Sequence, residues 1–267
     1  MTDLPDCLYE PDADVFRPTG LTRGPWDPGF QHAGPPAALL ARAVERAAGI
    51  SPGQAGRLSY DILRPVPVAP HRVETRILRP GRNVEQIEAT LTDAAGGDAL
   101  MRLTAWRLRR EELLLPDGLG EPEPPPPPPA GAPNSPVPAF WTEPVAYHAA
   151  LEWRFVHGDF DDAGPAATWT RLRVPLVAGE PASPLERLLV VADAASGISH
   201  VLDWTRWVFI NVDLGIHLER PPEGEWMAMD AVTRLGPVGA GLCTSVLSDE
   251  RGRVGVSTQT LRVAPQR

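Results

Sequence analysis

Hydrophobic residues recur at helical spacing in two stretches of the chain. From Pro35 to Ala48, apolar positions return every three or four residues while charged residues fill the opposite face, and Gly49 follows as a helix-ending glycine would. In the second stretch, Ser183 suits the N-cap and Pro184 the first helical position, and apolar residues continue at the same spacing to a stop near Gly197. The pattern therefore predicts two amphipathic helices.

Runs of residues that suit half-buried strands surround the two predicted helices, because they are rich in β-branched and alternating apolar residues. After the helices the runs are His71 to Leu78, Leu100 to Leu108, Phe209 to Leu218, Trp226 to Leu235 and Val254 to Val263. Shorter candidates before the helices are Phe16 to Thr22, Leu151 to Phe155 and Thr168 to Val174. Each half thus predicts one early helix followed by four strands.

The order of these elements repeats along the chain. Arg64, which precedes a proline, lies as far from Arg220, which also precedes one, as Leu91 lies from Leu247. A constant register over such a span indicates a duplicated unit. Between the copies, the prolines of residues 121–138 favour an extended spacer, because proline cannot donate to a strand ladder.

The duplication predicts the fold class. One helix lying on an antiparallel sheet is an α+β arrangement, and we expect two such units, over residues 1–112 and 147–267, with a linker over 113–146. If the two sheets pair edge to edge, they bury their exposed strand edges and create a cleft between the helices. We expect a functional site to be shared by the two halves there.

Composition and charge narrow the classes of function. The 267 residues are 43% hydrophobic, which is enough for two cored units, yet no run is long enough to cross a bilayer. The acidic, proline-interrupted start is unlike a secretory signal, so a cytoplasmic location is expected. A net charge of −9 argues against nucleic acid as a partner. All 25 basic residues are arginine, which excludes lysine Schiff-base chemistry, and Cys7 and Cys243 are expected to be reduced thiols.

Asp193 is the most informative single residue. It lies four positions after Leu189 and eight after Leu185, so it falls on the apolar stripe of the second predicted helix. A carboxylate there is costly unless it is hydrogen-bonded or used in chemistry. A buried aspartate that caps a loop or pairs with an arginine explains the position equally well, and the residue pattern alone leaves both interpretations open.

Four motifs resemble the acyl-CoA thioesterase II family of double hotdog enzymes. They are LSYDILRP (residues 58–65), VETRILRPGRN (73–83), VSTQTLR (256–262) and QHAGPPAALL (31–40), the last being similar to an actinobacterial-type branch of thioesterase-like proteins. The resemblance extends from about Gly20 to Val263, without the linker. It implies a double hotdog fold and the hydrolysis of acyl-CoA thioesters.

The resemblance also implies a set of catalytic residues. Members of the family are thought to activate water with an aspartate on the second-half helix, a threonine on the next strand and a glutamine on the last strand. Asp193 matches the aspartate and Gln259 the glutamine, whereas Asn211 stands where the threonine is expected. An asparagine can still orient a water molecule through its carbonyl oxygen or its amide, but with a different reach.

The start of the first helix is the expected oxyanion and substrate-binding site. Backbone N–H groups at a helix start can stabilise a developing oxyanion, and Gly34 would let a thioester carbonyl approach the backbone closely. His32 is a candidate to orient that carbonyl, although a histidine at such a position also serves as an ordinary loop hydrogen-bond donor. The base would then come from the second half and the oxyanion site from the first.

Other residues carry weaker signals. Arg64 and Arg220 could meet CoA phosphates, but a following proline is more typical of a strand start. Trp204 and Trp207 could line an acyl tunnel, but core packing explains them more simply. The loop of residues 157–162 has a histidine and acids without the spacing of a standard metal site, so no metal is expected. The Gly-x-Ser-x-Gly motif of serine hydrolases is absent from the sequence.

Three functions remain open from the sequence. The first is a thioesterase that uses water, needs no metal or redox cofactor, and acts on acyl-CoA or an acyl carrier protein thioester. The second is a hotdog enoyl-CoA hydratase or dehydratase, which needs an aspartate–histidine pair, and the sequence pairs no histidine with Asp193. The third is a non-catalytic acyl-thioester binding protein. In each case a homodimer or a higher homo-oligomer is expected.

Overall fold

The computed structural model describes residues 4–127, 141 and 143–266, and among them two helix-on-sheet units are joined into one continuous sheet. The strands of the first unit are β1 (Tyr9–Asp12), β2 (Val15–Pro18), β3 (Gly53–Ile62), β4 (His71–Arg79), β5 (Val84–Asp93) and β6 (Ala99–Arg109). Those of the second are β7 (Leu151–His157), β8 (Ala166–Leu172), β9 (Trp207–Asn211), β10 (Asp213–Leu218), β11 (Trp226–Leu235), β12 (Ala240–Asp249) and β13 (Gly252–Pro265). The helices are η1 (Gly20–Thr22), α1 (Gly34–Arg46), η2 (Tyr147–Ala150), α2 (Pro184–Ala192) and α3 (Ala195–Ile198).

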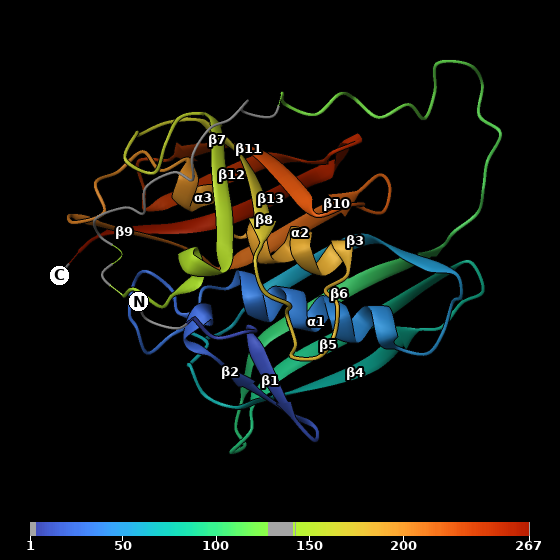
Figure 1. Cartoon of the computed structure of the whole chain (residues 1–267), viewed down its shortest axis with the longest axis horizontal. Coiled ribbons are helices and arrows are strands. Elements are labelled where there is room, and N and C mark those ends of the chain that lie inside the picture. Colours follow the sequence, from blue (N-terminus) through green and yellow to red (C-terminus); the bar gives the residue numbers. More distant parts are fainter. Residues whose placement is uncertain (1–3, 128–140, 142, 267) are drawn as a thin grey trace.

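The sheet runs through both halves without a break (Figure 1). Its order is β1-β2-β4-β5-β6-β3-β10-β13-β12-β11-β8-β7, and β9 pairs with β13 outside this path. The halves meet where β3 pairs antiparallel with β10, with Ser59 opposite Gly215. The predicted edge-to-edge pairing is therefore present, and it covers one strand edge of each half.

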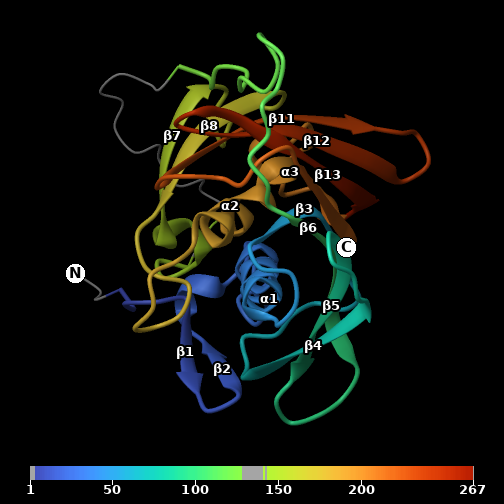
Figure 2. The same ribbon diagram turned by 90° about the vertical axis from the view of Figure 1, so that its right-hand side faces the viewer.

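Helices α1 and α2 lie together on the inner side of this sheet, which curves around them in Figure 2. The apolar stripe of α1, including Leu39 and Leu40, is fully buried, as helical spacing predicts. At the interface between the two helices, Arg42 of α1 makes a two-pronged contact with Glu180, which lies just before α2 (Nε to Oε2 3.0 Å, Nη2 to Oε1 2.8 Å). The helices thus bring the two halves together around one interior.

Local residue chemistry explains where the helices begin. At α2, the Ser183 side chain accepts the Glu186 N–H, while the Glu186 carboxylate accepts the Ser183 N–H, both at 3.1 Å. At α1, the prolines at the first helical positions cost no hydrogen bond, since those N–H groups lack an intrahelical partner. Helix α1 ends at Arg46, so the helix predicted over Pro35 to Ala48 extends two residues too far.

Two strand predictions are corrected by the structure. The run from Phe16 to Thr22 is not one strand, because β2 ends at Pro18 and the 3-10 turn η1 follows. The run from Phe209 to Leu218 is divided at Val212 into β9 and β10. The division has a clear cause: the Asp213 carboxylate accepts the Thr260 N–H at 2.6 Å, which takes that donor out of the strand ladder.

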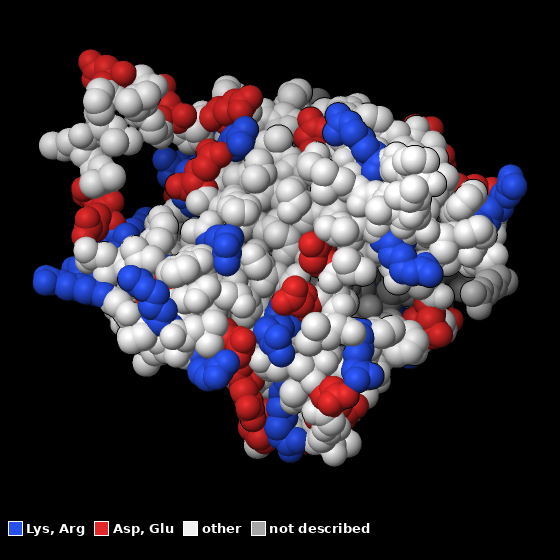
Figure 3. Space-filling view, turned by 180° about the vertical axis from the view of Figure 1, so that it is seen from behind, with Lys and Arg blue, Asp and Glu red and all other residues white. Residues whose placement is uncertain are grey.

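The surface and the linker add two observations. On the face drawn in Figure 3, acidic and basic side chains are interspersed, and a broad uncharged area lies between them. The described part of the linker contacts the C-terminal unit, because Glu123 accepts the Arg253 N–H at 2.8 Å and Pro126 accepts the Trp169 indole N–H at 3.2 Å. Among the described residues, none of the helices has the length and apolar character of a membrane span.

Candidate active site

Asp193 stands immediately after α2, where the helix gives way to a tighter turn. Helix α2 ends at Ala192, and Ala194 then donates its N–H to Val191, three residues back, at 2.9 Å. The stop predicted near Gly197 is therefore wrong, because the short helix α3 is a separate element. The Asp193 side chain is only 4% exposed, so it faces the interior as its place on the apolar stripe predicts.

Two neutral amides hold one oxygen of the Asp193 carboxylate. Asn211, at the end of β9, donates its Nδ2 to Asp193 Oδ1 at 2.7 Å, and Gln259 of β13 donates its Nε2 to the same oxygen at 3.2 Å. Other contacts orient both amides. The Gln259 Oε1 accepts the Ser196 N–H at 3.0 Å, and Asn211 Nδ2 also donates to the Asp213 carbonyl at 3.1 Å. Both NH₂ groups consequently point towards the carboxylate.

The second carboxylate oxygen faces a histidine from the other half of the chain. His32 Nδ1 lies 3.2 Å from Asp193 Oδ2 and also receives the Gly34 N–H at 3.1 Å. Burial lowers the pKa of His32, and the negative charge of Asp193 opposes that shift. The prediction that no histidine pairs with Asp193 is therefore wrong. A proton on Nδ1 can be given to Asp193, whereas an unprotonated Nδ1 accepts from Gly34.

Gly34 is at the start of α1, where the helix backbone lies close to α2. A Cβ atom at this position would lie 2.2 Å from the Val190 carbonyl oxygen of α2, so a side chain here would force the helices apart. This packing accounts for the glycine without a ligand. Its expected role in letting a thioester carbonyl approach stays a prediction, and its own N–H already donates to His32.

Tyr147 is a site residue that the sequence did not indicate. Its ring stacks on the His32 ring with centroids 3.7 Å apart and planes 2° from parallel. Its hydroxyl donates to the Val190 carbonyl at 2.7 Å, which fixes the ring against α2. Burial, and secondarily the charge of Asp193, raise the pKa of Tyr147 well above its usual value. A tyrosine after a linker carries no local signal for such a contact.

These residues border a cavity of about 550 Å³ that both halves line. Its walls include Asp193, His32 and Asn211, whereas Gln259 and Gly34 do not line it. Aromatic side chains from both halves form much of the remaining wall, and Trp204 is among them. The volume is within the range of pockets that enclose small organic ligands. The site residues predicted from the two halves are therefore brought together around one space.

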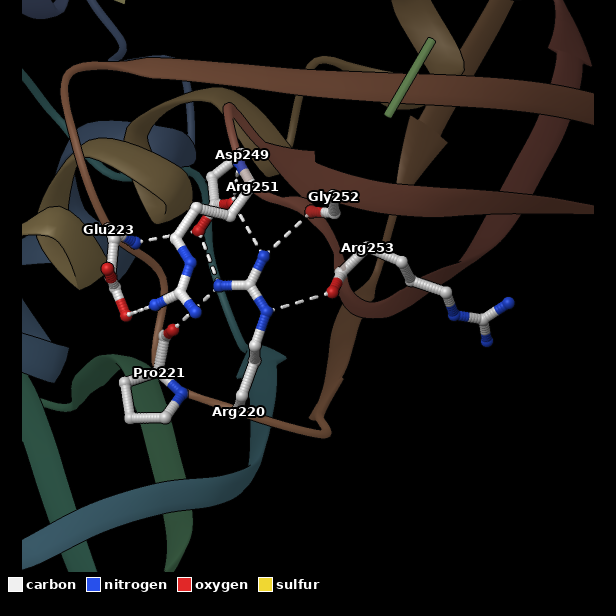
Figure 4. Close-up of polar contacts among 7 residues, drawn as sticks. All are labelled: Arg220, Pro221, Glu223, Asp249, Arg251, Gly252 and Arg253. Atoms are coloured by element: carbon white, nitrogen blue, oxygen red, sulfur yellow. Dashed lines mark hydrogen bonds and ion pairs between the residues drawn. The ribbon is translucent and has the colours of Figure 1, made fainter. Parts of the chain in front are cut away.

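The two repeated arginines do different things from what the sequence predicted. Neither begins a strand, because Arg64 follows the end of β3 and Arg220 the end of β10. Arg220 makes a two-pronged contact with buried Asp249, at 2.5 and 2.6 Å, and donates to the Gly252 and Arg253 carbonyls (Figure 4). These internal contacts occupy its guanidinium group. Arg64 lies at the cavity instead, with its side chain 57% exposed.

Asp249 anchors the turn between β12 and β13 through the same network. Its carboxylate also accepts the N–H groups of Glu223 and Arg251, both at 2.8 Å. Burial favours the neutral acid, but the hydrogen bonds from Arg220 and the two backbone donors prevail and lower the pKa of Asp249. Figure 4 shows these groups converging on the Asp249 carboxylate, whose charge is met by an arginine, whereas neutral amides hold the Asp193 carboxylate.

Comparison with known families gives matches over both halves. A family model for the acyl-CoA thioesterase N-terminal domain matches residues 22–108, and a model for the acyl-CoA thioesterase C-terminal domain matches residues 122–263. No sequence among the curated proteins matches the chain significantly.

Several solved structures are similar in fold. One is a candidate thioesterase II from Thermobifida fusca, with a TM-score of 0.71 and 22% identity, covering 95% of this chain and 93% of that chain. Another is a hot dog fold protein of unknown function from Alicyclobacillus acidocaldarius, with a TM-score of 0.71, 17% identity and coverage of 98% and 97%. A third is an acyl-CoA thioesterase II from Mycobacterium marinum, with a TM-score of 0.63, 17% identity and coverage of 96% and 94%. The predicted double hotdog, α+β fold is confirmed.

Proposed function

We propose how this chain, which belongs to the acyl-CoA thioesterase family, carries out its reaction. In this proposal Asp193 activates the water molecule that hydrolyses an acyl-CoA thioester. One observation carries the proposal. A carboxylate that is 4% exposed borders a cavity made by both halves, with its charge met by neutral amides and a histidine rather than by an arginine. A carboxylate in such surroundings suits the role of general base.

The chemistry follows from the two carboxylate oxygens. Asn211 and Gln259 hold Oδ1, which leaves Oδ2 to take a proton from water as the water oxygen attacks the thioester carbonyl carbon. The carbon–sulfur bond of the tetrahedral intermediate then breaks, and the proton held by Asp193 passes to the departing CoA sulfur. The products are the free acid and CoA. In this mechanism both amides orient the base, and Asn211, which lines the cavity, also orients the water.

His32 is proposed to bind the substrate carbonyl, and Gly34 to set the tautomer of its ring. When Gly34 donates to Nδ1, a neutral His32 ring carries its proton on Nε2, and that N–H can polarise the thioester oxygen. Tyr147 stacks on the ring and thereby limits its rotation. An acyl carrier protein thioester is an alternative substrate, and assembly as a homo-oligomer and a cytoplasmic location stay predictions.

Asp193→Asn tests the assignment of the base. We expect kcat for acyl-CoA hydrolysis to fall about 10²- to 10⁴-fold, because the amide cannot accept the proton of the water. Release of the CoA thiol can be followed with a thiol reagent, and Cys7 and Cys243 are both buried, so the folded protein adds little background. Asp117→Asn, on an exposed residue of the linker, is the matched control and should leave kcat unchanged. Unchanged hydrolysis by Asp193→Asn would refute the assignment.

The contact between His32 and Asp193 favours a second candidate, the hydration of an enoyl-CoA. An aspartate and a histidine 3.2 Å apart form the acid–base pair that this chemistry uses and that the sequence did not reveal. Loss of the ultraviolet absorbance of an enoyl-CoA on addition of the protein would support hydration. Release of thiol from a saturated acyl-CoA, with no change in the enoyl-CoA, would support hydrolysis. If calorimetry shows binding but neither product forms, the protein is a non-catalytic binder.

A further inference from the structure

Aromatic side chains are concentrated around the cavity to a degree that the composition does not explain. Aromatic residues make up 6% of the chain, yet four of its 8 tryptophans line this one space: Trp26, Trp141, Trp153 and Trp204. Phenylalanine and tyrosine side chains complete two groups of rings, each joined by ring contacts. Such a concentration suits a ligand that presents a flat, uncharged ring, because aromatic pairs gain energy beyond the area they bury.

The inner aromatic cluster consists of Tyr147, Trp153 and Phe160, all of them buried. Their rings meet edge to face: the Tyr147 and Trp153 centroids are 6.2 Å apart, and those of Trp153 and Phe160 are 5.1 Å apart. Through the stacked His32 ring, the cluster begins one ring away from the Asp193 carboxylate. A group attached to the reacting carbonyl can therefore reach this cluster.

The outer aromatic cluster consists of Trp26, Trp204 and Phe209. Trp26 lies 5.0 Å from Trp204 and meets Phe209 edge to face at 5.3 Å. Trp26 is 40% exposed, and the lining residues Leu63 and Val212 are exposed to a similar extent, so the Trp26 end of this cluster lies at the mouth of the cavity. The carrier arm of a thioester must reach solvent, and it would pass here.

We propose that the acyl group of the substrate bears an aromatic ring, which packs against the inner aromatic cluster, while the carrier arm leaves past the outer one. This inference rests on the proposed thioesterase function of the same cavity. The charged side chains among the lining residues are Asp27, Arg64 and Asp193, and none belongs to the inner cluster. The preferred acyl group is accordingly uncharged as well as planar.

A matched pair of substrates isolates the contribution of the ring. Phenylacetyl-CoA and cyclohexylacetyl-CoA have acyl groups of similar size and differ in aromaticity, and octanoyl-CoA supplies a linear chain for comparison. We expect kcat/KM for phenylacetyl-CoA to exceed that for cyclohexylacetyl-CoA about 3- to 10-fold, which is the rate equivalent of one or two aromatic contacts. Equal values, or a preference for octanoyl-CoA, would overturn the inference while leaving hydrolysis itself established.

Variants in the two clusters assign the effect to one of them. Phe160→Leu replaces an inner ring by an aliphatic group, and it should bring the phenylacetyl-to-cyclohexylacetyl ratio close to one. Trp26→Leu, in the outer cluster, should change kcat/KM for both esters by the same factor and so preserve the ratio. If Phe160→Leu does not fold, Trp153→Leu removes another inner ring and should lower the ratio in the same way. A ratio that changes in Trp26→Leu but in neither inner variant would contradict the assignment.

The proposed function and this inference can fail separately. If no acyl-CoA releases thiol, the hydrolysis proposal fails, and the same two esters then serve as unreacted probes in calorimetry with the wild-type protein. Tighter binding of phenylacetyl-CoA than of cyclohexylacetyl-CoA would still support an aryl-binding cavity. Equal affinity for the two would overturn it.

Discussion

The C-terminal ends of helices α1 and α2 are both closed by a side chain from the last strand of their own half. At α1, Arg107 of β6 donates to the carbonyls of Val44 and Ala47, at 3.1 and 2.9 Å. Near the end of α2, Gln259 of β13 donates to the Asp193 carbonyl at 2.9 Å. The last carbonyls of a helix have no partner within it, so both halves meet the same requirement. The two halves differ in the charge of the donating side chain, because Arg107 is a cation and Gln259 is neutral.

The charge of the side chain that donates to these carbonyls decides whether a nearby carboxylate is paired with a cation or left to react. Arg107 brings a buried cation, and Glu85 of β5 neutralises it at 2.5 Å while also accepting the Ile50 N–H. In the N-terminal half, the charges of Arg107 and Glu85 therefore neutralise each other inside the protein. Gln259 brings no charge, so among the described residues the carboxylate of Asp193 has no cationic partner other than His32 when that ring is protonated. A neutral closing group at the second helix thus leaves a negative charge available for chemistry.

The largest effect is expected from breaking the closed pair of the first half. Arg107→Met would leave Glu85 buried without its cation and the helix carbonyls without a donor. We expect the free energy of unfolding to fall by about 3–5 kcal/mol, since a buried charge loses its partner. Urea denaturation measures this change. The kcat of the protein that remains folded should not change, because neither residue lines the cavity.

Two further variants control this experiment. Arg109→Met removes an exposed arginine of the same strand, and it should alter stability by less than about 0.5 kcal/mol. The double variant Arg107→Met with Glu85→Leu should recover most of the lost stability, because no unpaired charge is left. If the double variant is as unstable as the single one, the closing of helix α1, and not the charge pair, dominates.

The counterpart in the second half should affect activity more than stability. Gln259→Leu removes the donor to Asp193 Oδ1 and leaves the Ser196 N–H without its acceptor. Hydrogen bonds to charged groups are worth about 1.5–3 kcal/mol, so kcat/KM should fall about 10- to 100-fold. Thiol release from an acyl-CoA measures the loss. Thr258→Val, at the exposed neighbour in the same strand, is the control.

This second experiment separates the two roles of Gln259. A variant that loses stability but keeps kcat/KM would mean that Gln259 only closes the helix, as Arg107 does. Loss of kcat/KM with little loss of stability would mean that it orients the base.

Local patterns were sufficient to predict the helices, most strands and the inward orientation of Asp193. The position of a residue relative to a helical period depends only on its neighbours, so the burial of Asp193 could be predicted without its partners. The duplication predicted that the two sheets pair edge to edge, but not that the pairing strands are β3 and β10. The unit boundaries at residues 112 and 147, and the catalytic roles, stay predictions.

What could not be predicted depends on contacts between distant segments. The pairing of His32 with Asp193 requires α1 to approach α2 at Gly34, and nothing near His32 encodes that approach. The break at Val212 arises because Asp213 accepts a donor from a strand far along the chain. Both are long-range packing effects that override local propensity.

The start of α2 allows a final, smaller test. It asks whether the buried carboxylate of Glu186 only caps the helix or also takes part in the reaction. The N-cap residue of α1, Ala33, makes no side-chain cap, whereas the Ser183 N–H is accepted by Glu186 at the start of α2. Burial raises the pKa of Glu186 to about 7, and the charge of Glu45 adds to the rise, while the Ser183 N–H and, more weakly, Arg42 and Arg46 oppose it. The unfolded chain would ionise this group near its ordinary value of 4.5.

Because the folded state holds this proton more tightly than the unfolded state, the contribution to stability is complete below pH 4.5 and is lost as the pH rises to about 7. The pKa of about 7 in the folded state lies roughly one pH unit above pH 6, and one such unit corresponds to about 1.4 kcal/mol. The free energy of unfolding should therefore fall by about 1.4 kcal/mol between pH 6 and pH 8. Glu186→Gln keeps an acceptor for the Ser183 N–H and should abolish this part of the slope, whereas Glu225→Gln, at an exposed site, should retain it. The pH profile of kcat should be the same in all three proteins, since Glu186 does not line the cavity. If Glu186→Gln shifted that profile instead, the carboxylate at the helix start would be coupled to the chemistry, and the separation between capping and catalytic carboxylates in this half would fail.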